Sequence, residues 1–490
     1  MTVRTGKIVF SLAFALCISG CTVGPKYQRA SAPVPAHWDV PDPWRESAPK
    51  DALAKGEWWT VFNDGTLNSL EKDAFAANQT LKAAAAHLEQ ARASAAIQVS
   101  TQFPQVATAP SASRQRLSGN RPAVSTIRPT ALTESNYTLP FSVSYEADLF
   151  GRRRRSIEAA QASYQATAAD LENTRLVIAA ELAGDYFTLR QIDTQLAILV
   201  RTVDTLSKGL DLVNSRHSGG VASGLDVAQE ETLLNTTRTQ AILLRQQRKQ
   251  LEDAIAVLVG KPAPDFHLPT NELDAEPPSI NVGLPSDLLE RRPDIAEAER
   301  QMAVANAQIG IARAAYFPSL NLYGNGGWQA ADIAKLVNVQ STIWAIGATA
   351  AESIFTGGQR RAQVQFAKAG YDASVADYRQ TVLNAFGEVQ DDVTGLLVLN
   401  EAQKSQQDAV DAARRTLDIA DSRYKGGLVS YLDVVSAQQN LLNNEQEMAV
   451  IRGQKLVTSV LLVKALGGGW DASSLAAVQV KTRLKDVVAP

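Results

Sequence analysis

The stretch SRYKGGLVSYLDVVSAQ at residues 422–438 has a near copy, SRHSGGVASGLDVAQEE, at residues 215–231. Ser215 pairs with Ser422 at an offset of 207 residues. The same offset of 207 joins other matched positions: Tyr164 with Tyr371, Asp170 with Asp377, Glu181 with Glu388, and Asp226 with Asp433. Self-similarity at a fixed offset indicates duplicated structural units. The chain therefore divides into two structural repeats, which we place at residues 52–270 and 281–476.

Each glycine-centred stretch lies inside a long tract without proline. No proline occurs between Pro140 and Pro262, or between Pro318 and Pro490. Because proline costs roughly 3 kcal/mol in a helix interior, these tracts permit very long helices. From Arg152 to Ser215, helical geometry gives a rod of roughly 95 Å, and the glycines allow the chain to reverse at its end. The sequence thus predicts a long helical hairpin in each repeat, preceded by an alanine-rich helical segment.

Two stretches of each repeat, between the opening helical segment and the hairpin, predict β-strands. Over residues 137–149 apolar side chains occupy the odd positions, whereas polar side chains and Pro140 occupy the even ones. Such alternation is typical of a strand with one apolar face. The corresponding face of the second repeat is formed by Trp344, Ile346, Ala348, Ala350 and Ile354. Four strands per chain cannot close a barrel in lipid alone, so several chains would have to share one. A small soluble sheet with one buried face is the alternative.

The N-terminus has the features of a bacterial lipoprotein signal. Arg4 and Lys7 precede an apolar run over residues 8–18 that is too short to span a bilayer. The run ends in ISGC at residues 18–21, which resembles a lipobox, with cleavage before Cys21 and diacylglycerol and an acyl chain on its thiol. We assign residues 1–20 to a lipoprotein signal peptide and the proline-rich residues 21–51 to a lipid-anchored extended arm. An ordinary signal peptide with an incidental cysteine is the alternative.

Composition and charge point away from several classes of protein. The formal net charge of the 490-residue chain is -3, which gives no electrostatic footprint for nucleic acid. Of the two cysteines, Cys17 leaves with the signal peptide, and the four histidines are far apart in the sequence. No cysteine–histidine metal cluster, phosphate-binding loop or nucleophile–base pair stands out. We therefore expect neither an enzyme nor a cofactor other than the lipid on Cys21.

Motifs over nearly all of the mature chain resemble those of the TolC-type outer-membrane factors. The resemblance is strongest to their lipid-anchored branch, the OprM or NodT group of RND efflux pumps. The matching motifs are CTVGPKYQRA (21–30), YEADLFGRRRR (145–155), ERRPDIAEAE (290–299), AAYFPSLNL (314–322), SIFTGGQRR (353–361) and the glycine-centred stretch at 422–438.

This resemblance implies an α+β membrane protein with the TolC-like fold. Three identical chains would form a homotrimer, each giving four strands to a shared twelve-stranded β-barrel in the outer membrane, with the helices forming an α-helical barrel through the periplasm. It also implies a function, as the channel of a tripartite efflux system. The channel would be a passive exit duct for drugs or other small molecules, which an inner-membrane RND-type pump and a periplasmic adaptor (membrane fusion) protein deliver. A channel for protein secretion and a periplasmic tether without a pore are the alternatives.

The resemblance further implies roles for individual residues. The adaptor would dock at the hairpin tips, at Gly219, Gly220, Val221, Gly426, Gly427 and Leu428. A periplasmic gate would use Tyr424, Leu432 and Asp433. Ser436 and Val429 stand where the family has a second acidic and a basic gate residue, which favours an apolar constriction beside one ring of aspartates. Asp433 could instead be a helix cap, because Asp226 occupies the matching place in the first repeat.

Three segments remain. Residues 152–155 are four consecutive arginines where strand changes to helix, and cations there oppose the helix dipole. Contact with phosphate groups of the inner leaflet and a solvated charged turn are both open. Residues 271–280 form a linker between the repeats, and residues 477–490 form a C-terminal tail.

Overall fold

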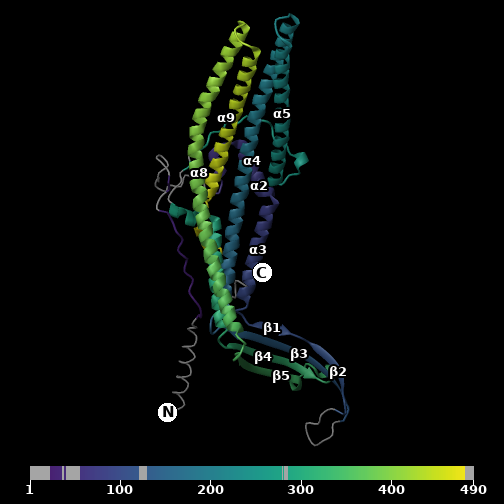
Figure 1. Ribbon diagram of the computed structural model, residues 1–490. Coiled ribbons are helices and arrows are strands. Elements are labelled where there is room, and N and C mark those ends of the chain that lie inside the picture. Colours follow the sequence, from purple (N-terminus) through teal and green to yellow (C-terminus); the bar gives the residue numbers. More distant parts are fainter. Residues whose placement is uncertain are drawn as a thin grey trace.

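The computed structural model describes residues 22–35, 38–39, 56–120, 130–278, 280 and 285–480. The predicted signal peptide, Cys21 and the last ten residues of the predicted tail lie outside these residues. Figure 1 shows an elongated molecule in which two long helical hairpins stand side by side, and a sheet extends sideways from the end of the rods opposite the hairpin turns.

The two halves of the chain have the same order of elements. The first half contains η1 (Trp58–Phe62), α2 (Gly65–Ala77), α3 (Gln79–Ser100), β1 (Gln105–Thr108), β2 (Ser111–Leu117), β3 (Leu132–Ala147), α4 (Arg152–Ser218), α5 (Gly224–Leu258) and η2 (Ala263–Asp265). The second half contains η3 (Pro285–Asp287), α6 (Leu288–Arg291), α7 (Pro293–Ala314), β4 (Ser319–Ala330), η4 (Ile333–Lys335), η5 (Val339–Ser341), β5 (Thr342–Ala351), α8 (Gln359–Lys425), α9 (Tyr431–Ala465) and η6 (Ala472–Ala477). The outgoing helices α4 and α8 each have 67 residues, and the returning helices α5 and α9 each have 35. The duplication read from the sequence is therefore also a duplication of structure.

The alanine-rich helical segment predicted at the start of each half is helical and is divided into two helices. In the first half Asn78 separates α2 from α3, because its side chain accepts a hydrogen bond from the Leu81 N–H at 3.0 Å and caps the second helix. In the second half Pro293 begins α7. Proline has no N–H to donate and is favoured at the first position of a helix, so the chain breaks there.

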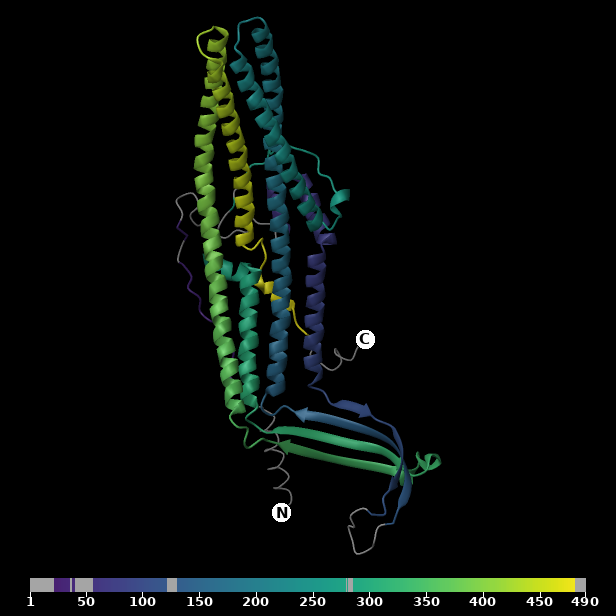
Figure 2. The same cartoon turned by 45° about the vertical axis from the view of Figure 1, so that its right-hand side comes forward.

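The rods pack as two hairpins joined along α4 and α9. Both views show α9 beside α4, with α5 and α8 on the outside (Figures 1 and 2). One large buried cluster draws on η1, α2, α4, α5, α7, α8 and α9 and includes Trp58, Tyr186 and Tyr378. Nearer the tips, smaller clusters continue between the hairpins, such as that of Val213 with Tyr431 and Val434. The molecule is therefore thick and firmly packed at mid-length and thin toward the tips.

A buried ion-pair network fastens the connection after α5 to the rods. The Asp193 carboxylate forms ion pairs with the guanidinium groups of Arg190, at 2.9 Å, and Arg248, at 2.6 Å. It also accepts a hydrogen bond from the Asn271 N–H at 3.1 Å. The Arg190 guanidinium in turn donates to the Pro269 carbonyl at 2.7 Å. Because buried charges are tolerated only when they are paired and hydrogen-bonded, this network holds residues 269–271 against α4 and α5.

The sheet is antiparallel with the order β1-β3-β4-β5, and β2 also pairs with β3. Since β1 and β2 pair with consecutive stretches of β3, they occupy one position and the sheet has the four strand positions that the sequence predicts. The register places apolar and small residues on one face, for example Val143 opposite Gly324 and Gly324 opposite Ile346. Trp344 and Ile346 on that face are 76% and 78% exposed. The alternation predicted for both repeats is confirmed, except that Ile354 lies beyond the end of β5.

No helix in the described part of the chain combines the length and apolar character needed to cross a membrane.

The four arginines at residues 152–155 pair with acidic and backbone groups of the chain itself. Arg152 and Arg153 pair with Glu146 of β3, and Arg154 pairs with Asp148 at 3.1 Å. Arg155 is 5% exposed and donates to the backbone carbonyls of residues 23–25, the shortest contact being 2.9 Å to the Pro25 oxygen. Acidic residues at the end of β3 therefore offset the unfavourable helix dipole, and the run joins the sheet, the rods and the N-terminal segment.

Arg155 is closely fitted to the N-terminal segment. A methyl group on Gly310 of α7 would lie 2.9 Å from the Arg155 side chain, and one on Gly24 would lie 2.6 Å from the Gly310 Cα. Gly24 also has a φ of +110°, which other residues rarely adopt. These two glycines let the backbone at residue 24, α7 and the guanidinium stack in direct contact.

We expect Arg155→Met to release residues 22–25 from the rods, because residues 27–31 keep hydrogen bonds of their own to α7 and α8. Charge-assisted hydrogen bonds contribute roughly 2 kcal/mol to local stability, so the released population should rise about 30-fold. Limited proteolysis of the purified full chain, read by mass spectrometry, measures this release. Arg152→Met is the matched control, because its side chain is half exposed and contacts Glu146 instead. Equal cleavage rates in the two variants would contradict the role given to Arg155.

Candidate functional site

Each hairpin tip is a tight glycine turn at the end of an outgoing helix. At the second tip the Leu428 N–H donates to the Arg423 carbonyl at 2.9 Å and the Gly427 N–H donates to the Tyr424 carbonyl at 3.0 Å. This is the Schellman pattern, which requires a left-handed residue, and Gly427 has a φ of +70°. The first tip repeats the pattern, with φ +73° at Gly220. The second glycine of each pair therefore makes the turn possible, whereas Gly219 and Gly426 have ordinary φ values near -81°.

The aspartates beyond the turns cap the returning helices. The Ser223 N–H donates to the Asp226 carboxylate at 3.0 Å, and the Ser430 N–H donates to the Asp433 carboxylate at 3.1 Å. These are capping boxes, in which a side chain satisfies an N–H that the helix leaves free. Capping is therefore a role that both aspartates share.

The tips present apolar side chains to solvent. Val221 and Leu428 are 73% and 71% exposed, and Leu432 is 52% exposed. Isolated exposed apolar residues are common, but here they gather at the ends of two adjacent hairpins. The structure places Leu432 next to Asp433 at the start of α9, one turn away from the predicted docking residues. Within one chain the predicted docking and gate residues thus lie at the same end of the rods.

Tyr424 connects the two hairpins. The Arg216 guanidinium at the end of α4 lies over the Tyr424 ring at 4.9 Å from its centre, close enough for a cation–π contact. Tyr424 also packs against Tyr431, with ring centres 4.9 Å apart. A residue of the first repeat therefore contacts a predicted gate residue of the second.

Sequence reasoning missed Arg216 and Tyr431, and it missed Glu230, a carboxyl group buried between the hairpins. Glu230 lies on α5, has no exposed surface, and faces Gly209 of α4. The available signal was a difference between the repeats. At the offset of 207, Glu230 corresponds to Ala437 and Tyr431 corresponds to Gly224, so these residues are specific to one half.

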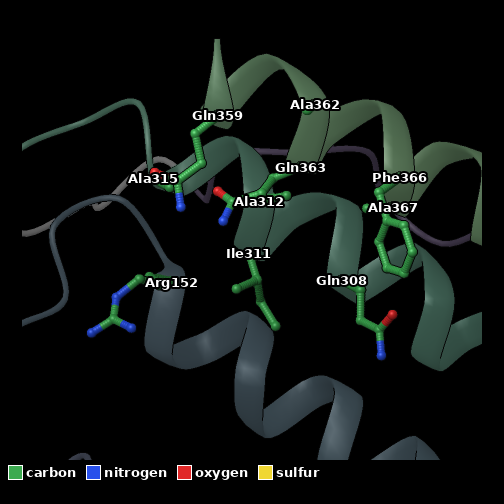
Figure 3. Close-up of a pocket in the computed structure, with 10 residues that line it drawn as sticks. All are labelled: Arg152, Gln308, Ile311, Ala312, Ala315, Gln359, Ala362, Gln363, Phe366 and Ala367. Atoms are coloured by element: carbon green, nitrogen blue, oxygen red, sulfur yellow. The ribbon is translucent and has the colours of Figure 1, made fainter. Parts of the chain in front are cut away.

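Figure 3 shows a hollow where α7 and α8 meet the start of α4, near the sheet. Phe366 of α8 stands in it and is 81% exposed. The hollow contains none of the predicted gate or docking residues. Its lining is mostly alanine and glutamine with a few larger side chains: Arg152, Gln308, Ile311, Ala312, Ala315, Gln359, Ala362, Gln363, Phe366 and Ala367. Among the described residues, no group of three or more histidine, cysteine, aspartate or glutamate side chains could hold a metal ion.

Comparison with known proteins identifies the family and several relatives of this chain. The model of the outer membrane efflux protein family matches residues 70–261 and 284–468, one match in each repeat. The toluene efflux pump outer membrane protein TtgF of Pseudomonas putida is 34% identical over 472 residues, which cover 94% of this chain and 96% of that protein. The pyoverdine export outer membrane protein OpmQ of Pseudomonas aeruginosa is 32% identical and covers 93% of this chain and 96% of its own length.

A solved structure agrees with these relatives. The outer-membrane channel OprN superposes with a TM-score of 0.84 at 29% identity, covering 92% of this chain and all of the other. The tandem match of the family model reflects the duplication seen in sequence and fold. The relatives are outer-membrane efflux channels, which agrees with the predicted function and not with an enzyme, a secretion channel or a tether without a pore. The chain belongs to the outer membrane efflux protein family and is the outer-membrane channel component of an efflux system.

Proposed function

We propose that the protein is a passive, unselective exit duct whose hairpin tips dock a periplasmic adaptor protein and form a gate. The observation that carries this proposal is the joining of a sheet with one apolar face to rods of 67 residues, which at 1.5 Å per residue reach roughly 100 Å from the membrane. Such an arrangement connects the outer membrane with a partner on the far side of the periplasm. Energy for transport would come from an inner-membrane pump of the RND type.

A homotrimer accounts for the exposed features of the single chain. The outer edges of β5 and of β1 with β2 have no partner strand among the described elements, and open edges are not tolerated in lipid. Three copies would pair these edges into twelve strand positions, a size at which a barrel encloses an open interior. A second copy against α8 would also cover Phe366.

The exported compounds are small molecules of more than one class in the relatives. Toluene is named for one relative and pyoverdine for another, and these two compounds share little chemistry. A duct that serves either of them would take its selectivity from the pump. We propose the same for this chain.

The N-terminus would add a lipid anchor. The lipobox at residues 18–21 would place a diacylglycerol and an acyl chain on Cys21, next to the segment that Arg155 holds against the sheet–rod junction. The anchor and the sheet would thus contact outer-membrane lipids together.

The gate is tested by single-channel recording in planar bilayers. Three-fold symmetry would put three Asp433 carboxylates at one height, where like charges repel and attract cations, with Leu432 as the apolar narrowing beside them. We expect Asp433→Ala to raise the resting conductance and weaken cation selectivity. Asp226→Ala is the matched control, since it loses an equivalent cap but should leave selectivity unchanged. Identical recordings for the two variants would reduce Asp433 to a helix cap, and a wild-type protein without conductance would refute the duct.

Docking is tested by crosslinking to the adaptor in cells. Gly427→Pro should abolish both the crosslink and efflux at normal outer-membrane levels. Proline fixes φ near -65° and removes the N–H, whereas Gly427 has φ +70° and donates to Tyr424. Gly426→Ala is the control because residue 426 has an ordinary φ of -81°. An unchanged crosslink in the proline variant would show that this tip is not the docking turn.

Anchoring is tested by Cys21→Ser. We expect acylation to disappear while most of the protein stays in the outer membrane, because the shared sheet is a larger membrane contact than lipid chains. Metabolic labelling with palmitate and membrane fractionation measure the two effects. Labelling that persists in the variant would remove Cys21 as the acylated residue, and complete release into the periplasm would remove the sheet as a membrane anchor.

A further inference from the structure

Glu230 is a carboxyl group in a place that ordinarily excludes charge. It has no exposed surface. The polar group that faces its oxygens is the Tyr431 hydroxyl, and no cation among the described residues lies beside them. An ionised carboxylate without a cation beside it is disfavoured in such a site. Burial accordingly raises the pKa of Glu230, and the nearby Tyr431 hydroxyl opposes that rise only in part, so the closed seam favours the uncharged form.

Glu230 faces Tyr431 across the boundary between the two hairpins. A methyl group on Gly209 of α4 would lie 2.5 Å from the Glu230 Oε1 and 3.6 Å from the Tyr431 hydroxyl oxygen. The absence of a side chain at residue 209 thus makes room for a carboxyl group of α5 and a phenol of α9 at the same point. Tyr431 is only 5% exposed, and burial together with Glu230 raises its pKa far above the ordinary value.

Apolar contacts surround this polar pair on both sides along the rods. Toward the tips, Val213 packs with Tyr431 and Val434. Toward the thick middle, Leu206 packs with Leu233 and Leu234. The pair therefore lies inside the seam that joins the hairpins of one chain, and separating the hairpins would admit water to Glu230.

Other charged and titratable groups near the pair have partners of their own. From α4, Arg216 stacks on Tyr424. From α5, the Asp226 carboxylate accepts the Ser223 N–H. From α8, the group that faces the pair is the Tyr424 hydroxyl, and the Tyr424 ring contacts that of Tyr431. None of these is a cation paired with Glu230.

We propose that Glu230 and Tyr431, seated over Gly209, form a proton-dependent latch that keeps the second hairpin of each chain packed against the first. The proposal rests on the proposed function, in which movement of the second hairpin opens the periplasmic end. With Glu230 uncharged the seam stays closed. When α9 moves away, Glu230 meets water, ionises, and no longer returns easily into the seam.

The sign of the pH dependence follows from this arrangement. The pKa of Glu230 is raised in the closed seam and returns toward its ordinary value of about 4.3 in water. The closed state therefore binds the additional proton, gains stability as the pH falls toward that value, and loses stability as the pH rises. The ratio of closed to open states changes by at most about tenfold per pH unit.

Single-channel recording of the full-length protein at two pH values tests the latch. We expect the resting conductance of the wild type to fall several-fold when the periplasmic side is taken from about pH 8 to about pH 5.5. Glu230→Gln should stay closed at both values and lose most of this dependence. Glu231→Gln is the matched control, because Glu231 is the next residue on α5 and is exposed; it should keep the wild-type dependence.

A second variant guards against misfolding of the first. Gly209→Ala places a methyl group against Glu230 and should raise the resting conductance at the acidic value. Gly184→Ala on the same helix is its control, since no atom lies within 4 Å of a methyl group there. If Glu230→Gln keeps the pH dependence of Glu231→Gln, or if Gly209→Ala behaves like Gly184→Ala, the latch is wrong while the channel stands. A wild type without channels would instead overturn the proposed function and the latch with it.

Discussion

Backbone groups at the two outer edges of the sheet govern the architecture. Inside hydrocarbon each unpaired N–H or carbonyl group is disfavoured by several kcal/mol, and water cannot substitute. A single chain with four strand positions therefore cannot be the working unit in a membrane. The exposed Trp344 and Ile346 suit contact with lipid, so the apolar face and the open edges call for the same solution, closure by further copies.

Duplication explains the regular features of the rods, and divergence explains the irregular ones. Both hairpins have outgoing helices of 67 residues and returning helices of 35, with the same turn and the same serine–aspartate cap. The differences gather where one hairpin meets the other. Glu230 and Tyr431 have Ala437 and Gly224 as counterparts, so the interface joins unlike halves and the two hairpins can have unequal mobility.

The features that sequence predicted are those written in local patterns. Strand alternation, proline-free tracts and the glycine turn each depend on neighbouring residues, and the structure confirms them. The break between α2 and α3 also had a local signal, because asparagine at residue 78 is a favoured helix cap. The alanine-rich sequence on both sides of Asn78 favours helix and obscured that signal. Contacts between distant residues left no comparable signal. Arg155 contacts Pro25, which is 130 positions away in the sequence, and Asn271 contacts Asp193, which is 78 positions away. Neither the Arg155 contact nor the ion-pair network could therefore be predicted from the sequence.

The contact of Arg155 with the carbonyl groups of residues 23–25 also fixes the height of the N-terminal segment relative to the sheet. The Val23 N–H donates to the Phe150 carbonyl at 3.2 Å, just where β3 passes into α4. An extended chain spans at most about 3.6 Å per residue, so the lipid proposed for residue 21 would be tethered within roughly 7 Å of Val23. With so short a tether, a pull on the distant tips would be borne by the proposed acyl chains and by the strand ends at the same depth in the membrane. An anchored protein of this kind would resist being drawn toward a pump without any increase in the height of its sheet.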